Sequence, residues 1–504
     1  MSNLLIAISG VFTLYNILAI LGGTIAGIII GALPGLSSVM GLSILLPMTF
    51  TMEGLGGIMM LLGVFCGSIY GGSISAILIN TPGTSASAAT ALDGYPMATK
   101  RNEPGRALGI ATFASTFGGL FSCAALVIFS PLLAKVALQF SAPEYFALAL
   151  FGISIITSIS SKSIIKGLIG GVFGLLLGCI GIDKLTGVER FTFDSVYLMG
   201  GISYIPLLIG LFAFAQGLLN IEDAYGQVFQ KINVKIKKSF PTKEDRKRIY
   251  PTVLRSSIIG TIIGAIPGTG GDIASWVCYN EARRWSKHKE EFGNGSPEGI
   301  AASESGNNAI SGGALVPLLS LGIPGDAGTA VMLGSLMMLG IAPGPLLFTE
   351  HTTTVYMLFI GLFLANVFMG LLGFLGIKQF TKVLNVSNKI LIPIIFTFCI
   401  VGSFSINNSI NDVFFMMISG IIGYFLLKLD FSIPPIILGL ILGSMAESNF
   451  RRSLVLSGGS FATFFERPIS AIFILLALIS LFSPLITSFW KKQKSKKKMC
   501  ETAE

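Results

Sequence analysis

The chain opens with a long stretch that has no charged side chain. Residues 1–52 contain no Asp, Glu, Lys or Arg. Hydrophobic residues make up 52% of the chain and charged residues only 12%, and the mean hydropathy is +0.79. Because about 20 apolar residues span a bilayer, this pattern predicts an all-α polytopic membrane protein with about ten to twelve transmembrane helices. Further uncharged runs cover 54–92, 107–134, 145–161, 195–221, 352–377, 390–411 and 468–490.

Two short strings in the chain are near copies of each other. GALPGL at 31–36 and GAIPGT at 264–269 lie 233 positions apart, almost half of the 504 residues. Each is followed by a second Pro-Gly element, INTPGT around Pro82 and LGIPGD around Pro324. The same pair of interruptions therefore occurs twice, which predicts two repeated halves.

These interruptions point to a transport site. Proline lacks the backbone N–H and glycine admits unusual dihedral angles, so an apolar helix must break at Pro-Gly. Broken backbone at bilayer depth is tolerated only where it faces protein or a water-filled cavity. The predicted fold therefore includes broken or re-entrant helices, with helix breaks at Pro34, Gly35, Pro267 and Gly268.

The net charge of +9 is concentrated in two basic clusters. Residues 231–248 hold eight Lys and Arg, and residues 491–498 hold six Lys. Beside apolar spans, such clusters mark the cytoplasmic side and contacts with anionic lipid, so we expect no nucleic-acid partner. The predicted segments are an N-terminal half (1–225), a basic cytoplasmic linker (226–250), a C-terminal half (251–490) and a basic cytoplasmic tail (491–504).

Several functional classes lack the residues that they need. The six cysteines form no CxxC pair and the two histidines lie beside charged segments, so we expect no metal centre or other cofactor. The chain has no Gly-x4-Gly-Lys-Ser/Thr string for ATP. Gly-Gly-Asp at 270–272 suggests an intramembrane aspartyl protease, but the Gly-x-Gly-Asp and Tyr-Asp strings of those enzymes are missing. We therefore expect a transporter rather than an enzyme.

The second Pro-Gly element of each half offers groups that suit an anion. A helix that restarts after Pro82 presents free N–H groups and several hydroxyls at the positive end of its dipole. Such an end binds carboxylates without a buried arginine, and no Arg or Lys lies deep in any apolar run. The predicted substrate-binding residues are Asn80, Thr81, Pro82, Gly83, Thr84, Ser85, Pro324, Gly325 and Thr329.

Acids and amides gather around the breaks of the second half. Carboxylate and amide oxygens suit a hard cation such as Na⁺. An ionisable group at membrane depth costs about 2.5 kcal/mol or more, which makes each acid a functional candidate. The alternative is that the acids cap helix N-termini near the interface. The predicted ion-coupling residues are Asp272, Glu304, Asn307, Asn308 and Asp326.

Residues 251–280 connect two polar stretches and are too few for two full crossings of the bilayer. A re-entrant hairpin with GAIPGTGGD near its tip fits this length, and a single tilted span is the alternative. Small residues at four-residue spacing, such as Gly23, Gly27 and Gly31, predict close helix packing.

Taken in order, these strings resemble a known family. GALPG, YGGSISAILINTPGT with DGYPMA, GAIPGTGGDIASW, and ESGNNAISGGALVPLLSLGIPGD with GIAPGP are similar to the large membrane subunit, the TctA type, of tripartite tricarboxylate transporters. The resemblance runs from Gly23 to Pro345. One departure is Ser303, where we expect proline before the acid.

The resemblance implies a permease of the bacterial inner membrane. It implies two partners, a small membrane subunit (TctB type) and a periplasmic solute-binding protein (TctC type) that delivers a carboxylate. Citrate or a related carboxylate would enter by secondary transport, driven by a Na⁺ or H⁺ gradient. A carrier for a different small organic solute and a passive channel are the alternatives. The family blocks place substrate and ion at 80–85, Asp93, 268–272, Asn307, Asn308 and 324–329.

Overall fold

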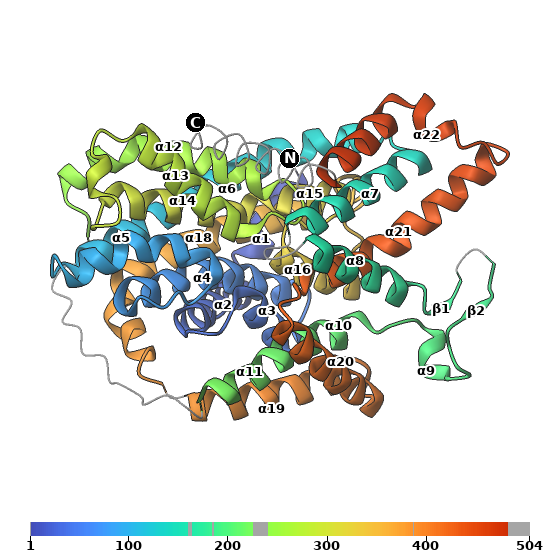
Figure 1. The fold of residues 1–504 in the computed structure, drawn as a ribbon, viewed down its shortest axis with the longest axis horizontal. Helices are drawn as coiled ribbons and strands as arrows, with labels where there is room; N and C mark the ends of the chain where they lie inside the picture. The colour runs from blue at the N-terminus through green and yellow to red at the C-terminus, as the bar shows by residue number, and fades with distance from the viewer. Residues whose placement is uncertain (1, 160–163, 184–185, 225–239, 387, 482–504) are drawn as a thin grey trace, which may run out of the picture. The chain divides into compact units, whose positions relative to one another are not determined.

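The computed structural model describes residues 2–159, 164–183, 186–224, 240–386 and 388–481 (Figure 1). In these ranges the chain is helical apart from loops and one two-stranded antiparallel sheet. Seven of the described helices are long and apolar enough to cross a membrane, and four shorter apolar helices accompany them. The predicted all-α polytopic membrane fold is thereby confirmed. Most of the basic linker and the whole basic tail lie outside the described residues.

The chain divides into two compact units, and each is built from two separate stretches. Unit 1 comprises residues 1–138 and 204–424, and unit 2 comprises residues 139–203 and 425–504. All four Pro-Gly breaks belong to unit 1. The predicted repeated halves concern the order of the motifs along the chain, and they stay a prediction.

Unit 1 contains most of the helices. Its first stretch holds α1 (Ser2–Val11), α2 (Leu14–Ala32), α3 (Ser38–Thr49), α4 (Gly56–Ile79), the 3₁₀ turn η1 (Ser85–Ser87), α5 (Ala88–Thr99) and α6 (Pro104–Ala137). Its second stretch holds α10 (Tyr204–Leu208), the π-helical η2 (Ile209–Phe214), α11 (Ala215–Ala224), α12 (Lys243–Gly264), α13 (Gly270–Trp285), the 3₁₀ turn η3 (Lys289–Glu291), α14 (Pro297–Gly313), α15 (Leu315–Leu321), α16 (Ala327–Met338), α17 (Leu347–Glu350), α18 (Thr352–Val383), α19 (Asn388–Asn407) and α20 (Ile410–Lys428), whose last residues belong to unit 2.

Unit 2 is smaller and carries the sheet. It contains α7 (Ala142–Ile159), α8 (Ile164–Gly178), β1 (Gly181–Ile182), β2 (Glu189–Arg190), α9 (Val196–Met199), α21 (Pro434–Leu456) and α22 (Thr463–Glu466). Helices α8 and α21 pack closely, because a Cβ atom at Gly174 would lie 2.0 Å from the Ile436 carbonyl oxygen. Stretches that are far apart in the sequence therefore make one unit.

Helices α2 and α4 meet through glycines on both sides. A Cβ atom at Gly23, Gly27 or Gly31 would lie 2.1 to 2.5 Å from a backbone oxygen of α4. Likewise, a Cβ atom at Gly63 or Gly67 of α4 would lie 2.4 Å from a backbone oxygen of α2. Such backbone-to-backbone contact needs small residues, so the predicted close packing of this glycine series is confirmed.

We expect Gly23→Ala to destabilise the protein by about 1–3 kcal/mol, because the added methyl group would overlap the Met60 carbonyl oxygen. The neighbouring Gly22 is a matched control, since a Cβ atom there meets nothing within 4 Å. Gly22→Ala should keep or raise stability by up to about 1 kcal/mol, the helix-propensity gain. Thermal unfolding in detergent measures both variants, and equal melting temperatures would contradict the packing.

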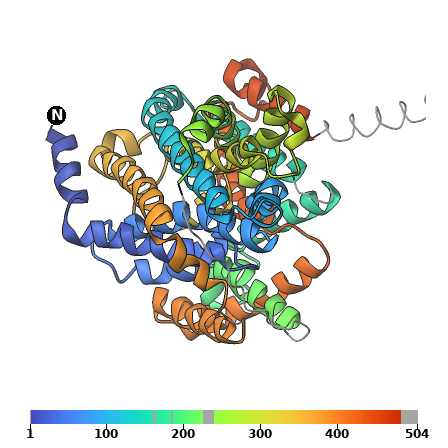
Figure 2. The same ribbon diagram turned by 90° about the vertical axis from the view of Figure 1, so that its left-hand side faces the viewer.

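Helix α14 lies at the centre of unit 1. All of its residues from Pro297 to Gly313 are buried, and it packs against α5, α6, α12 and α13. Figures 1 and 2 show α12, α13 and α14 side by side, with α12 and α13 forming a helical hairpin that has the GAIPGT string at its turn. Polar residues on α14 therefore face other helices of unit 1.

Candidate functional site

The near-copy strings have the same local structure. Helix α2 ends at Ala32 and α12 ends at Gly264, each just before its Pro-Gly pair. Gly35 has φ 84° and Gly268 has φ 83°, a left-handed conformation that favours glycine. The predicted helix breaks at Pro34, Gly35, Pro267 and Gly268 therefore occur where the sequence places them.

The helix ends that precede the second Pro-Gly element of each half also have the same backbone conformation. Helix α4 ends at Ile79 and α15 ends at Leu321, and the residues that follow them, Asn80 and Gly322, have φ 55° and 74°. Both are left-handed C-terminal caps of a kind that ends many helices. The chain then passes through Pro82-Gly83 or Pro324-Gly325 before the next helix begins.

Within each half the two breaks touch through their glycines. A Cβ atom at Gly83 would lie 1.9 Å from the Gly31 carbonyl oxygen, and one at Gly325 would lie 2.6 Å from the Gly264 carbonyl oxygen. In addition, the Gly268 N–H donates to the Gly325 carbonyl at 2.7 Å. The second break of each half therefore packs against the helix end that forms the first.

The helices that restart after the four breaks differ in their capping. Ser37 caps α3 by accepting from the Met40 N–H. Asp326 and Thr329 form a reciprocal capping box at the start of α16, with the Thr329 N–H donating to Asp326 at 2.8 Å. The N–H groups at the first and fourth restarts are thus partly satisfied by side chains.

The second and third restarts have no side-chain cap. At α13 the Thr269 hydroxyl donates instead to the Ile263 carbonyl of α12 and to the Ile266 carbonyl after it, at 2.5 and 2.9 Å. At η1 and α5 the Ser87 hydroxyl donates to the Thr84 carbonyl at 2.8 Å. Neither hydroxyl accepts from the first N–H groups of the helix that it precedes.

These two uncapped restarts meet each other. The Ser85 hydroxyl donates to Asp272 Oδ1 at 2.8 Å, which links η1 to the first turn of α13. A Cβ atom at Gly271 would lie 2.9 Å from the Ala86 side chain. Ser85 and Asp272 are exposed, whereas Ala86 is buried. The second break of the first half and the first break of the second half therefore form one cluster that is open on one side.

The predicted substrate-binding residues occupy different environments in this cluster. Asn80 and Thr81 are exposed, and the Thr81 hydroxyl donates to the Ile79 carbonyl at 3.3 Å. Thr84 is buried beside Ser85. Thr329 is buried and occupied by its bonds to Asp326. The groups of this set that remain available for a ligand lie at 80–85.

The predicted ion-coupling acids lie in three settings. Asp326 caps α16, as the alternative interpretation proposed. Asp272 lies in the first turn of α13, where its carboxyl group accepts from the Ser85 hydroxyl. Glu304 lies inside α14, far from any helix start, and is fully buried. Only Asp326 is therefore an N-cap.

Glu304 is held by hydroxyl groups from the first half of the chain. Thr90 donates to its Oε1 at 2.5 Å and Ser115 donates to its Oε2 at 2.8 Å. Thr90 also bonds Ser303, the residue at the position where we expected proline. In the described part of the chain no basic side chain forms an ion pair with Glu304. The buried carboxyl group therefore has no fixed positive partner.

The two adjacent amides of α14 differ sharply. Asn308 Nδ2 donates to the Glu304 carbonyl at 3.0 Å. Asn307 is fully buried, and neither its Nδ2 nor its Oδ1 has a hydrogen-bond partner. A Cβ atom at Gly271 would lie 2.5 Å from Asn307 Oδ1, so this amide faces the start of α13.

Asp93 has a structural role that sequence reasoning missed. Its Oδ1 accepts from the N–H groups of Gly293, Gly295 and Ser296 at 2.8 to 2.9 Å. It therefore holds the loop that leads into α14. The family blocks placed substrate and ion near this acid, but its hydrogen bonds go to the backbone of the second half. In the sequence, only the DGYPMA string, which contains Asp93, marked this acid as a residue of interest.

An ion pair also joins the N-terminal half to the start of α12, which lies in the predicted linker. Arg106 bonds Asp245 through two nitrogens, at 2.6 and 3.0 Å. Burial raises the pKa of the Asp245 carboxyl, but bonds from Arg106 and Thr242 outweigh this and lower the pKa below its ordinary value. The charged form of Asp245 is therefore favoured in the folded protein.

We expect this pair to make stability depend on pH. Because the folded-state pKa of Asp245 is lowered, its contribution is complete above the unfolded-state pKa of about 4 and is lost as the pH falls through the folded value. Melting temperatures between pH 7 and pH 3 should fall less steeply in Asp245→Asn than in the wild type. Parallel curves for the two proteins would contradict the assignment.

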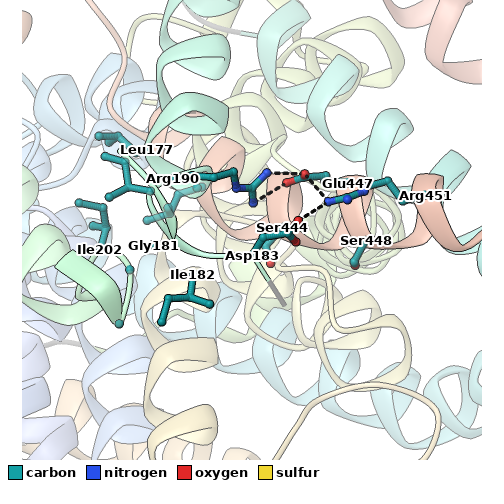
Figure 3. Close-up of a pocket in the computed structure, with 15 residues that line it drawn as sticks. Leu177, Gly181, Ile182, Asp183, Arg190, Ile202, Ser444, Glu447, Ser448 and Arg451 are labelled. Carbon is teal, nitrogen blue, oxygen red and sulfur yellow. Dashed lines mark hydrogen bonds and ion pairs between the residues drawn. The ribbon is translucent and has the colours of Figure 1, made fainter. Parts of the chain in front are cut away.

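Unit 2 contains a separate cavity of about 190 Å³ between its hairpin and α21 (Figure 3). Arg190 bonds both carboxylate oxygens of Glu447 at 2.6 and 3.2 Å, and Arg451 bonds Asp183 at 2.7 Å. Because two acids neutralise two arginines, the charges hold the hairpin to α21 and attract no particular ion, so we assign this cavity no ligand.

Comparison with known proteins gives a family and two relatives. The model of the tripartite tricarboxylate transporter TctA family matches residues 17–438. An uncharacterized 52.8 kDa protein in the TAR-I ttuC′ 3′ region of Agrobacterium vitis is 37% identical over 98% of this chain and 97% of its own length. An uncharacterized protein in the TAR-II ttuC′ 3′ region is 33% identical over 46% of this chain and 97% of its own length. No solved structure matches the chain.

Proposed function

Because the chain belongs to the tripartite tricarboxylate transporter TctA family, we propose that it is the permease subunit that imports a tricarboxylate such as citrate, or a related carboxylate, across the bacterial inner membrane. A Na⁺ or H⁺ gradient drives the import. A small membrane subunit of the TctB type and a periplasmic binding protein of the TctC type are its partners. The chain itself is a multi-pass membrane protein of a transporter family.

The meeting of two uncapped helix restarts is the observation that carries this proposal. The starts of η1 and α13 come from different halves and touch through Ser85 and Asp272. Helix N-termini with free N–H groups attract carboxylates. A ligand between them contacts both halves at once, which is the arrangement that alternating access requires.

The acids explain why the transport is coupled to a cation. Asp272 and Asp326 lie at the two helix restarts of the second half, and no basic side chain in the described ranges forms an ion pair with either. A carboxylate substrate that binds beside Asp272 is repelled by that carboxylate. A cation bound at the same time offsets this repulsion, so substrate and ion favour each other's binding.

Uptake by proteoliposomes tests the proposal. The permease is reconstituted with its small subunit and binding protein, and labelled di- and tricarboxylates are offered under an imposed Na⁺ or H⁺ gradient. We expect saturable accumulation that unlabelled carboxylates inhibit and their neutral amide analogues do not. Transport that needs no gradient would indicate a channel. Absence of carboxylate uptake with all partners present would overturn the substrate class.

A further inference from the structure

Few buried polar atoms in the described residues lack a hydrogen-bond partner. They belong to eight side chains, and in Asn307 both the nitrogen and the oxygen are unpaired. An unpaired buried polar group costs about 1–3 kcal/mol, so native proteins keep such groups for a reason. Asn307 has no exposed surface, and the bulk solvent cannot satisfy its amide.

The position of Asn307 gives that reason. It projects from the central helix α14 toward Gly271, where a Cβ atom would lie 2.5 Å from Oδ1. Gly271 in turn faces Ala86, which follows Ser85 in η1. The amide therefore lies against the point where the two uncapped helix restarts meet.

The chemistry of this point favours an anion as the ligand of the amide. The first N–H groups of α13 and η1 have no side-chain acceptor, and the dipole of α13, a helix of 16 residues, favours negative charge at its start. Because neither Asn307 atom holds a bond, the amide can turn and present Nδ2 without losing one. A glycine at 271 leaves room for this group, since any side chain there would strike it.

We propose that Asn307 binds the transported substrate, with its Nδ2 donating to a substrate carboxylate between the starts of η1 and α13. This assignment rests on the proposed transport of a carboxylate. It moves Asn307 from the predicted ion-coupling set to substrate recognition. The carboxylate then receives backbone N–H groups from both halves and one side-chain amide from α14.

Two substitutions of Asn307 test the assignment. Asn307→Asp keeps the shape and the oxygen but removes the donor and adds a negative charge, while Asn307→Leu removes both polar atoms. We expect each to raise the KM for carboxylate uptake by about tenfold or more, the loss of one hydrogen bond to a charged group. At saturating carboxylate, the cation concentration that gives half-maximal uptake should stay unchanged in Asn307→Leu.

Stability separates this role from a structural one. Because Asn307 has no partner, Asn307→Leu should keep or raise the melting temperature. Asn308→Leu is the matched contrast and should lower it, since Asn308 Nδ2 donates to the Glu304 carbonyl. A lower melting temperature of Asn307→Leu with an unchanged KM would overturn the proposal in favour of a packing role.

The remaining outcomes are equally informative. If Asn307→Asp keeps the wild-type KM and shifts only the cation dependence, Asn307 is a ligand of the cation, and the proposal is wrong. If wild-type protein transports carboxylates and Asn307→Leu matches it in every respect, the inference fails while the proposed function stands. If the wild type itself takes up no carboxylate, the proposed function fails first.

Discussion

Replacing Glu304 with glutamine should abolish gradient-driven accumulation while leaving exchange of substrate across the membrane. Glutamine keeps the shape of the side chain. Thr90 and Ser115 donate to the two carboxylate oxygens of Glu304 at 2.5 and 2.8 Å; the glutamine oxygen can accept from one of these hydroxyls, and its Nε2 can donate to the oxygen of the other. The substitution removes the one negative charge in the middle of α14. Without that charge, we expect Asp272 and Asp326 alone to bind the cation too weakly for it to be carried with the substrate, so the carrier can only equalise the two concentrations.

The surroundings of Glu304 explain why we expect so large an effect. A buried carboxyl group without a basic partner is costly, and proteins keep such groups at membrane depth for ion or proton transfer. Glu304 has no exposed surface and lies one helical turn from Asn307 on α14. A change of charge there acts directly on an anion beside Asn307.

Two uptake assays in the same proteoliposomes distinguish the outcomes. Accumulation under an imposed Na⁺ or H⁺ gradient measures coupling, and exchange of labelled for unlabelled substrate measures the carrier alone. Ser115→Ala serves as a control that removes one hydrogen bond but keeps the charge of Glu304. If Glu304→Gln accumulates substrate as the wild type does, Glu304 has no part in ion coupling.

The positions of the breaks could be predicted from the sequence because they depend on local chemistry. The first Pro-Gly pair of each half has the same effect on the backbone, since Gly35 and Gly268 share a left-handed conformation. Asn80 and Gly322, two residues before Pro82 and Pro324, share one as well. Repeated strings therefore translate into repeated local structure.

Which breaks meet could not be predicted, because that depends on contacts between distant residues. Ser85 and Asp272 are 187 positions apart. Thr269 could have capped α13, but its hydroxyl donates to the Ile263 and Ile266 carbonyls, six and three residues earlier. A hydroxyl can either cap a helix or bond a preceding carbonyl, and the residue type alone does not decide between the two.

The hydroxyl partners of Glu304 were missed for a related reason. Thr90 and Ser115 lie in apolar helices, where such residues usually bond the preceding turn of their own helix. Their partner is about 190 or more residues away along the chain. It could not be predicted either that residues 139–203 and 425–504 together form unit 2, because the two stretches share no sequence motif.

We expect Gly83→Ala and Gly325→Ala to destabilise the protein and to abolish uptake. A methyl group at Gly83 would lie 1.9 Å from the Gly31 carbonyl oxygen, and one at Gly325 would lie 2.6 Å from the Gly264 carbonyl oxygen. A backbone atom cannot move aside as a flexible side chain can. Gly83→Ala, the tighter of the two contacts, should therefore lower the free energy of unfolding by about 3 kcal/mol. Thermal unfolding and uptake in proteoliposomes measure the two effects.

The comparison between these variants also tests the repeat itself. Neither glycine has a positive φ, so alanine is excluded by contact alone and not by backbone strain. Gly22→Ala controls for the general effect of an added methyl group, since nothing lies within 4 Å of a Cβ atom there. If the two halves use their paired breaks alike, both variants lose uptake, with the larger loss of stability at Gly83. A stable and active Gly83→Ala would mean that the second break does not rest on the end of α2, and the shared architecture of the halves would be wrong.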